Sequence, residues 1–145
     1  MRVESWMKHP VWTVKPQDTV RHARETMERH RVNQLPVVTN GRLVGIVTDR
    51  DLRDAFPSVF ESADAAAHHR RADTDPATIP VEDVMTRDVL ALAPSVYVAD
   101  AARLMRRERI GAVPIVDGTR LVGVLTRSDV LDAFVELAQN AGLSD

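Results

Sequence analysis

The hydrophobic and polar positions of this chain describe the same series of elements twice. Two apolar runs rich in β-branched residues flank Asn40-Gly41, a dipeptide that strongly favours a tight hairpin turn. Two further runs of the same kind flank Asp117-Gly118. The pattern therefore predicts two β-hairpins, at 35–47 and 113–125.

Helical spacing precedes each hairpin. Val20, Ala23 and Met27 fall on one face of a predicted helix, which Asp18 or Thr19 can cap. The second copy repeats this face with four residues: Val98, Ala101, Ala102 and Met105. A short extended piece comes before each of these helices, at 11–14 and at 89–92.

Another helix is predicted after each hairpin, starting at Thr48 in the first copy and at Thr126 in the second. Its apolar face consists of Leu52, Ala55 and Phe56 in the first copy, and of Val130, Leu131, Phe134 and Leu137 in the second. Each copy is thus a β-α-β-β-α unit.

The two copies match without a gap from Met7 to Phe56 when the sequence is shifted by 78 residues. Met7 then falls on Met85, and the run Arg-Leu-Val-Gly at 42–45 falls on the same run at 120–123. One unit alone leaves an apolar sheet face open, whereas two can pack their sheets together and bury it. We therefore expect an α+β fold in which two β-α-β-β-α motifs pack as a pseudo-twofold pair.

The repeat also sets the expected domain boundaries: the first motif at 1–56, a connector at 57–79, the second motif at 80–138 and a tail at 139–145. The connector contains an alanine-rich polar patch at 61–71, which permits a short helix. It also contains His68-His69, but adjacent histidines lack the spacing of metal ligands, so no metal site is predicted.

A shared motif closes each copy. The first copy has Pro36-Val37-Val38, the turn, and then Gly-Ile-Val-Thr-Asp-Arg-Asp at 45–51. The second has Pro114-Ile115-Val116 and Gly-Val-Leu-Thr-Arg-Ser-Asp at 123–129. Two such motifs in one register strongly resemble CBS domains, which occur as tandem pairs called Bateman modules. The resemblance covers nearly the whole chain apart from the connector and the tail.

The resemblance implies a regulatory module that senses a ligand and requires no cofactor. Such pairs bind AMP, ADP, ATP, NAD or S-adenosylmethionine in clefts between the two motifs, and two pairs commonly associate into a flat homodimeric disc. The chain is similar to small stand-alone bacterial proteins of the acetoin-utilisation type, without their C-terminal domain. We expect the ligand signal to reach a regulated protein, which the sequence does not identify.

The Thr-x-x-Asp of each copy suits a nucleoside. Residues three apart on a helix share a face, so Thr48 and Asp51 can point at one ligand. An ionised aspartate only accepts hydrogen bonds, and adjacent ribose hydroxyls are two donors at a matching separation. We therefore assign Asp51 and Asp129 to ribose, and place Thr48 and Thr126 at helix starts that favour an anion. Helix capping alone is the other interpretation of the motif.

The resemblance also implies positions for the base: Thr13, Val14, Asn33, Gln34 and Leu35 in the first copy, and residues that include Ala112 and Val113 in the second. Some family members carry basic residues where this chain has Asn33 and Gln34. Nearby arginines such as Arg50 and Arg127 can supply that charge, or are simply solvated. Because the first copy is polar at the base-facing positions and the second is small and apolar, we expect two non-equivalent sites.

Composition narrows the function further. The chain has 145 residues, a net charge of −2 and no cysteine, which excludes thiolate metal sites and gives no basic field for nucleic acid. No signal peptide or membrane span is visible, so we expect a cytoplasmic protein. Catalytic motifs are absent, and duplicated carboxylates suit paired ligand binding better than an acid and a base. We therefore predict a sensor and not an enzyme. A structural dimerisation module with vestigial sites is the alternative, and a hydrolase acting on nucleotides in the cleft ranks last.

Overall fold

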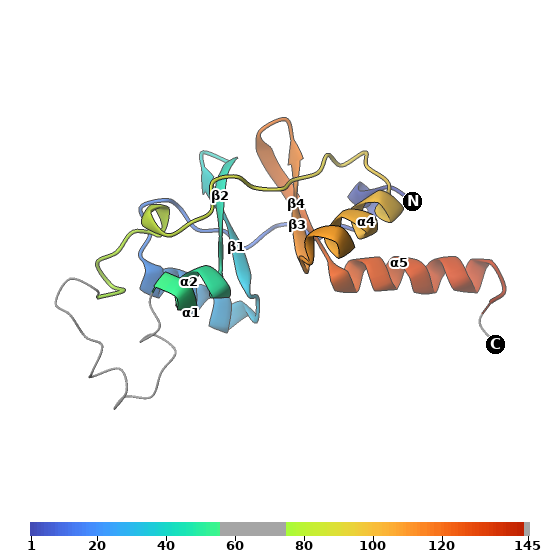
Figure 1. Ribbon diagram of the computed structural model, residues 1–145. Coiled ribbons are helices and arrows are strands. Elements are labelled where there is room, and N and C mark those ends of the chain that lie inside the picture. The colour runs from blue at the N-terminus through green and yellow to red at the C-terminus, as the bar shows by residue number, and fades with distance from the viewer. Residues whose placement is uncertain (56–74, 144–145) are drawn as a thin grey trace, which may run out of the picture. The chain divides into compact units, whose positions relative to one another are not determined.

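The computed structural model describes residues 1–55 and 75–143, which belong to two compact units (Figure 1). The first-repeat unit is Trp12–Val89. The second-repeat unit combines Leu90–Asp145 with the N-terminal segment Met1–Val11. Each unit contains one β-hairpin with a helix before it and a helix after it, which confirms the predicted α+β class and the doubled order of elements.

The described elements correspond one to one between the units. The first-repeat unit contains α1 (Val20–His30), β1 (Gln34–Thr39), β2 (Arg42–Thr48), α2 (Asp49–Ala55) and the 3-10 helix η3 (Val81–Asp83). The second-repeat unit contains the 3-10 helix η1 (Val3–Ser5), α4 (Val98–Glu108), β3 (Ala112–Asp117), β4 (Arg120–Thr126) and α5 (Arg127–Asn140). Both hairpins are antiparallel and have a register shift at the same place.

Local chemistry explains these element boundaries. The Thr19 hydroxyl accepts a hydrogen bond from His22 N at 3.1 Å and so caps α1, as one of the two predicted alternatives requires. Asn40 and Gly41 have φ values of 52° and 80°, the positive pair that a two-residue hairpin turn needs. In the second hairpin, Asp117 ends β3, and the turn lies one residue later than predicted, at Gly118 and Thr119.

Two further predictions differ from the structure. The extended pieces expected at 11–14 and 89–92 form no strand, and each makes a single parallel bridge, Val14 to Val37 and Leu92 to Ile115. Helix α5 continues to Asn140, so the first two residues of the expected tail at 139–145 are helical.

The leading segment of each sequence copy packs into the unit of the other copy. Val3 is fully buried in the core of the second-repeat unit, and Val81 is fully buried in that of the first-repeat unit. A Cβ placed on Gly123 would lie 2.5 Å from Met7 Sδ and 3.1 Å from the Lys8 carbonyl oxygen. Gly45 meets Met85 in the same way, at 2.6 Å. The motif glycine is therefore needed because a methionine segment crosses it closely.

Each core lies between the hairpin and its helices. The predicted face of α1 is confirmed, because Val20, Ala23 and Met27 are buried. On α4, Val98, Ala101 and Met105 are buried as predicted, whereas Ala102 is only partly buried. The hairpins contribute Leu35, Val37 and Val47, and correspondingly Val113, Ile115 and Leu125. The two repeats thus build two separate clusters with matching positions.

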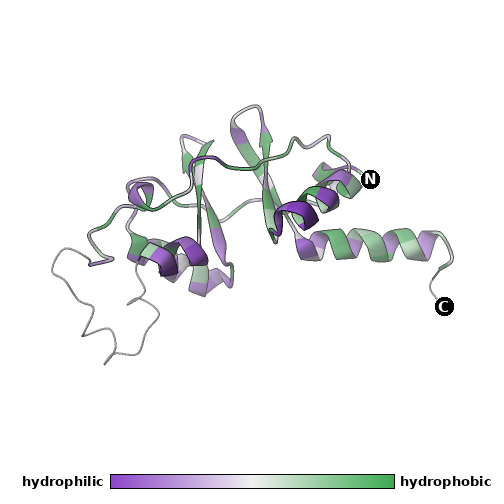
Figure 2. Ribbon diagram, viewed as in Figure 1, coloured by the Kyte–Doolittle hydropathy of each residue, from purple (hydrophilic) through white to green (hydrophobic). Residues whose placement is uncertain are grey.

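Helix α5 departs from its predicted packing. Ala133 is buried and Val130 is partly buried, but Leu131, Phe134 and Leu137 are exposed, Phe134 by 63%. Figure 2 shows hydrophobic residues along much of this helix. Most apolar side chains of α5 are therefore exposed in the described part of the unit.

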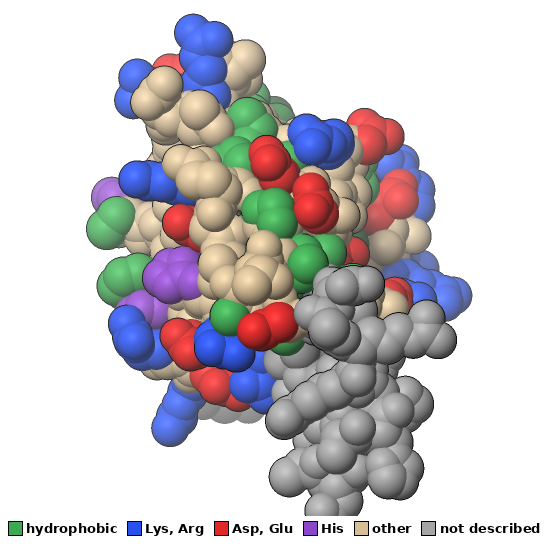
Figure 3. Space-filling model, turned by 90° about the vertical axis from the view of Figure 1, so that its left-hand side faces the viewer, with side chains coloured by type: hydrophobic (Ala, Val, Ile, Leu, Met, Phe, Trp, Pro, Cys, Tyr) green, Lys and Arg blue, Asp and Glu red, His purple; other side chains and the backbone are tan. Residues whose placement is uncertain are grey.

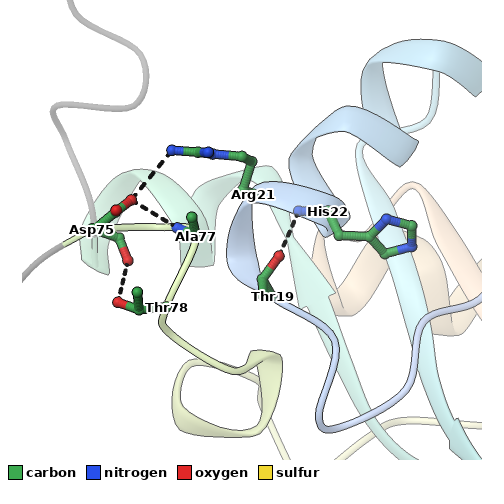
Figure 4. A network of polar contacts seen from close by, with 6 residues as sticks. All are labelled: Thr19, Arg21, His22, Asp75, Ala77 and Thr78. Carbon is green, nitrogen blue, oxygen red and sulfur yellow. Dashed lines mark hydrogen bonds and ion pairs between the residues drawn. The ribbon is translucent and has the colours of Figure 1, made fainter.

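The described end of the connector is attached to α1 (Figure 4). Asp75 accepts a hydrogen bond from Arg21 at 3.2 Å and another from Ala77 N at 2.9 Å, while the Thr78 hydroxyl donates to the Asp75 carbonyl oxygen. The predicted helix at 61–71, His68-His69 and Phe56 lie outside the described residues.

The surface of the described chain shows no field of one sign on the face in Figure 3, where acidic and basic side chains are interspersed. Within residues 1–55 and 75–143, no helix is long and apolar enough to cross a membrane. The same residues hold no group of three or more histidine, aspartate or glutamate side chains that could bind a metal ion.

Candidate functional site

Thr48 and Asp51 form a reciprocal pair at the start of α2. Thr48 N donates to Asp51 Oδ2 at 3.0 Å, and Asp51 N donates to the Thr48 hydroxyl at 3.0 Å. The two bonds satisfy amides that the first helical turn leaves unpaired. Asp51 is partly buried, and the described residues offer no partner to its second oxygen, Oδ1. That oxygen is a ready acceptor for an incoming donor.

Thr126 and Asp129 form the equivalent capping box at the start of α5. Asp129 Oδ2 accepts from Thr126 N at 2.6 Å and from the Thr126 hydroxyl at 2.8 Å. Asp129 is only 4% exposed, and it is the one charged residue that is buried in the described part of the chain. A buried carboxylate needs partners for both oxygens.

Lys8 supplies the partner for the second oxygen. Its Nζ lies 3.3 Å from Asp129 Oδ1. The backbone fixes this approach, because Lys8 N donates to Val124 O at 2.8 Å and Val124 N donates to Lys8 O at 3.0 Å. In the first-repeat unit, Thr86 makes the same backbone bridge, to Ile46, but its short neutral side chain cannot form an ion pair. The two aspartates therefore differ: Asp51 has an open oxygen, whereas Asp129 has none.

The sequence interpretation did not include Lys8. The signal in the sequence is that the repeat aligns Lys8 with Thr86, a cation with a neutral residue. That difference gains meaning only once the N-terminal segment is known to pack in the second-repeat unit.

The base-facing candidates of the first copy all lie in the first-repeat unit. Gln34 is paired with Thr48 in the hairpin, and the Asn33 carbonyl accepts from Asp49 N at 2.8 Å, so both lie where β2 passes into α2. Thr13 precedes the parallel bridge of Val14 to Val37, which directs it toward the same end of the hairpin as Gln34. Thr13, Asn33 and Gln34 keep some exposed surface.

Val14 and Leu35 have a different place. Val14 is buried, and both its amide and its carbonyl are bonded to β1. Leu35 is fully buried in the core cluster. Their contribution is to hold the hairpin end in position, while their neighbours form its accessible surface.

In the second-repeat unit, Ala112 is paired with Thr126 and partly exposed, and Val113 is fully buried. The Arg127 guanidinium lies over Gly111, since a Cβ on that glycine would be 3.5 Å from one of its nitrogens. Arg50 is not its structural equivalent; it extends along α2 toward Asp54, with 4.0 Å between Nε and Oδ2. Of these two arginines, the structure thus brings only Arg127 next to a position that the sequence predicts to face the base.

These two units define a class: a tandem-repeat module of α+β type in which each copy presents a capped aspartate at the junction of hairpin and helix. The family model for the CBS domain matches residues 3–58 and 81–136. The chain therefore belongs to the CBS domain family, as its motifs predict.

Related proteins share this module in different settings. The CBS domain-containing protein YhcV of Bacillus subtilis is 33% identical over 128 residues, which are 88% of this chain and 81% of that protein. An inosine-5'-monophosphate dehydrogenase of Korarchaeum cryptofilum is 32% identical over 130 residues, which are 89% of this chain but only 23% of that enzyme. The chain therefore spans about a quarter of that relative and most of the other.

Solved structures share the fold. A putative acetoin utilization protein (AcuB) from Vibrio cholerae matches with a TM-score of 0.80 and 27% identity, over 100% of this chain and 98% of that one. CBSX2 in complex with AMP matches with a TM-score of 0.76 and 28% identity, over 94% and 97%. The CBS domain pair of protein MJ0100, in complex with 5'-methylthioadenosine and S-adenosyl-L-methionine, matches with a TM-score of 0.71 and 27% identity, over 94% and 98%.

Proposed function

We propose that this protein is a regulatory module that binds an adenosine-containing ligand, such as AMP, ADP, ATP, NAD or S-adenosylmethionine, and signals its presence to a partner protein. We propose no catalytic step. The observation that carries the proposal is the open oxygen of Asp51, which is held in place by Thr48 and lies where Gln34 pairs with Thr48. A fixed acceptor at a hairpin end with polar neighbours suits a ribose hydroxyl.

Two relatives support this choice of ligand. CBSX2 holds AMP, and the MJ0100 pair holds 5'-methylthioadenosine and S-adenosyl-L-methionine. The part that these ligands share is adenosine, which agrees with recognition through ribose and base rather than through phosphate. Since these ligands are cytoplasmic metabolites, we place the activity in the cytoplasm.

Signalling requires that the ligand binds one conformation better than another, since equal affinity shifts no population. We propose that Asp129 is the switchable site, because a hydroxyl that binds its Oδ1 must first displace Lys8. Displacement would free Lys8 and loosen the N-terminal segment. The partner that detects this change is a regulated protein.

We also propose a homodimer that forms through α5. Leu131, Phe134 and Leu137 are each more than half exposed, and a cavity of about 390 Å³ between α4 and α5 is lined by apolar residues that include Tyr97 and Phe134. Exposed apolar surface of this kind marks an association site. A second copy would cover it with the same residues.

Calorimetry tests the ligand proposal directly. The wild-type chain is titrated with AMP, ATP, NAD and S-adenosylmethionine, and then the variant Asp51→Asn is titrated with whichever ligand binds. We expect at least about a tenfold loss of affinity, because the amide offers one oxygen where the carboxylate offered two. Asp54→Asn is the matched control on the same helix, since Asp54 is exposed and faces Arg50. Equal affinity in both variants would remove Asp51 from the site.

The alternative function is a structural dimerisation module whose sites are vestigial. The ion pair of Asp129 favours this alternative, because Lys8 already occupies Oδ1, the oxygen that a ligand would need. This alternative predicts a stable dimer that gives no heat with any of the four ligands.

A further inference from the structure

A cavity of about 400 Å³ lies in the second-repeat unit, where the last turn of α4 meets the first turn of α5. This volume is within the range of small-molecule sites. Seven of the described residues line the cavity, and three of these seven are arginines: Arg106, Arg109 and Arg127. The other four, Ala102, Met105, Ile110 and Val130, are apolar. No acidic residue is among them, and Asp129 does not take part.

These three guanidinium groups have no ion pair or hydrogen bond to any residue that the structure describes, whereas two neighbouring arginines on α4 do. Arg103 pairs with Asp100 at 2.6 Å, and Arg107 pairs with Glu108 at 3.0 Å. Among the described residues, the three arginines of the cavity therefore have no compensating acidic partner, whereas Arg103 and Arg107 outside it do.

The corresponding positions of the first copy do not carry three arginines. Under the 78-residue shift, Arg106 corresponds to Glu28, Arg127 to Asp49 and Ala102 to Arg24. Arg24 pairs with Glu28 at 2.9 Å, and Asp49 lies 3.7 Å from Arg53. The first copy thus balances its charges at these positions, whereas the second carries three cations and a small alanine.

Helix electrostatics does not account for the difference. Arginines near the end of a helix stabilise it, which explains Arg109 and its counterpart Arg31. Arg127, however, is the first residue of α5, where the helix dipole disfavours a cation and favours an acid such as Asp49. Helix stability therefore does not explain the cation at this position.

We propose that this cavity is an anion site that binds a small molecule carrying a phosphate group with two or more negative charges. Arginine guanidinium groups match phosphate oxygens in geometry and remain charged at all relevant pH values. The Arg127 guanidinium lies beside Gly111, 3.5 Å from where a Cβ on that glycine would be. Met105, Ile110 and Val130 provide an apolar wall for the organic part of the ligand. The site is separate from Asp51 and does not depend on adenosine binding there.

The test uses pyrophosphate as the probe, with binding measured by calorimetry on the full chain. The informative variant is Arg127→Asp, which restores the residue of the first copy. We expect pyrophosphate affinity to fall by at least about tenfold, while the melting temperature without pyrophosphate stays equal or rises, because the helix dipole is now satisfied. Arg106→Glu is expected to lose affinity to a similar extent.

Arg103→Glu and Arg107→Glu are the matched controls, because each reverses one positive charge on α4 outside the cavity, as Arg106→Glu does inside it. Both should keep affinity within about twofold of wild type, apart from the general effect of net charge. Asp51→Asn should bind pyrophosphate normally, which separates this site from the adenosine proposal. Titrations with adenosine and ATP distinguish a nucleotide from an inorganic ligand. If the ligand is a nucleotide, Arg127→Asp should lower the affinity for ATP but not for adenosine. If the ligand is inorganic, neither affinity should change. The absence of pyrophosphate binding in wild type, or equal losses in the control variants, would overturn the proposal.

Discussion

Lys8 and Asp129 form an ion pair between the N-terminal segment and the helix start of the second repeat, with 3.3 Å between Nζ and Oδ1. The pair is asymmetric in burial, since the Lys8 side chain is 64% exposed and that of Asp129 only 5%. The pair occupies Oδ1 of Asp129 in the second repeat, whereas Oδ1 of Asp51 in the first repeat has no partner among the described residues. The two aspartates of the duplicated motif are thereby made different by one residue outside the motif.

Lys8→Thr should open the second site, because it installs the residue that the first-repeat unit has at Thr86. In an Asp51→Asn background, which isolates the second site, we expect adenosine-ligand affinity to rise by about three- to tenfold, or about 0.7–1.4 kcal/mol. The ligand no longer has to displace an ammonium group from Asp129. Calorimetry with the ligand that binds wild type measures the effect.

The same substitution should also lower stability. Lys8 itself is mostly exposed, but its removal leaves the buried Asp129 Oδ1 without a partner, so we expect the free energy of unfolding to fall by about 1–3 kcal/mol. Lys15→Thr removes an exposed lysine elsewhere and is the control for net charge. Unchanged affinity in Lys8→Thr would show that Lys8 does not compete with the ligand.

Met7 and Gly123 should be energetically coupled, because Met7 packs on the Cα of this glycine. Gly123→Ala alone is expected to lower the free energy of unfolding by about 1–3 kcal/mol through overpacking. Adding Met7→Ala should cost less than the sum of the two single changes, by about 0.5–1.5 kcal/mol. Urea denaturation of the four proteins measures this coupling.

Met85→Ala is the matched control for that cycle. Met85 packs on Gly45 in the other unit, so its cost should add to that of Gly123→Ala without coupling. Coupling of Gly123 to Met85 in place of Met7 would mean that the leading segments stay with their own sequence copies.

The sequence predicts most of the local structure because the pattern is local. The hairpin around Asn40-Gly41, the Thr19 cap and the buried face of Val20, Ala23 and Met27 all follow from residues close together along the chain. The exchange of leading segments does not follow in this way. Met7 and Met85 occupy the same position in the repeat, so either could pack on either glycine, and only the folded chain distinguishes the two arrangements.

Thr126→Ala should destabilise the protein more than Thr48→Ala does. Loss of a threonine cap costs about 1 kcal/mol, but Thr126 also donates its hydroxyl to the buried Asp129 at 2.8 Å. Removing that donor leaves a buried carboxylate oxygen less satisfied, which adds about 1 kcal/mol. Thermal unfolding should therefore show the larger decrease in melting temperature for Thr126→Ala.

Thr126→Ser restores the hydroxyl and should recover most of the loss, while Thr119→Ala, in the exposed turn, should have almost no effect. Equal decreases for the two capping threonines would show that burial of Asp129 adds nothing to the cap.

The candidate site shows the same limit of sequence inference. The pairing of Thr48 with Asp51 and of Thr126 with Asp129 follows from their spacing and is present in the structure. The spacing alone cannot show whether each carboxylate has an oxygen to spare. That depends on Lys8, which lies more than a hundred residues away in the sequence from Asp129. Partners that are distant in the sequence therefore decide whether a capping aspartate also has an oxygen available for a ligand.

Phe134→Glu should separate the proposed dimer. Phe134 is 63% exposed on α5 and lines the apolar cavity, so a second copy that covers this face would bury the new carboxylate without a partner. We expect the dissociation constant of the dimer to rise at least about 100-fold, because an unpaired buried charge is costly. Light scattering over a range of concentrations should show a dimer for wild type and a monomer for the variant. Leu143→Glu, an equally drastic change at a more exposed position beyond α5, is the control and should stay dimeric. A monomeric wild-type protein, or a variant that remains a dimer, would contradict association through α5.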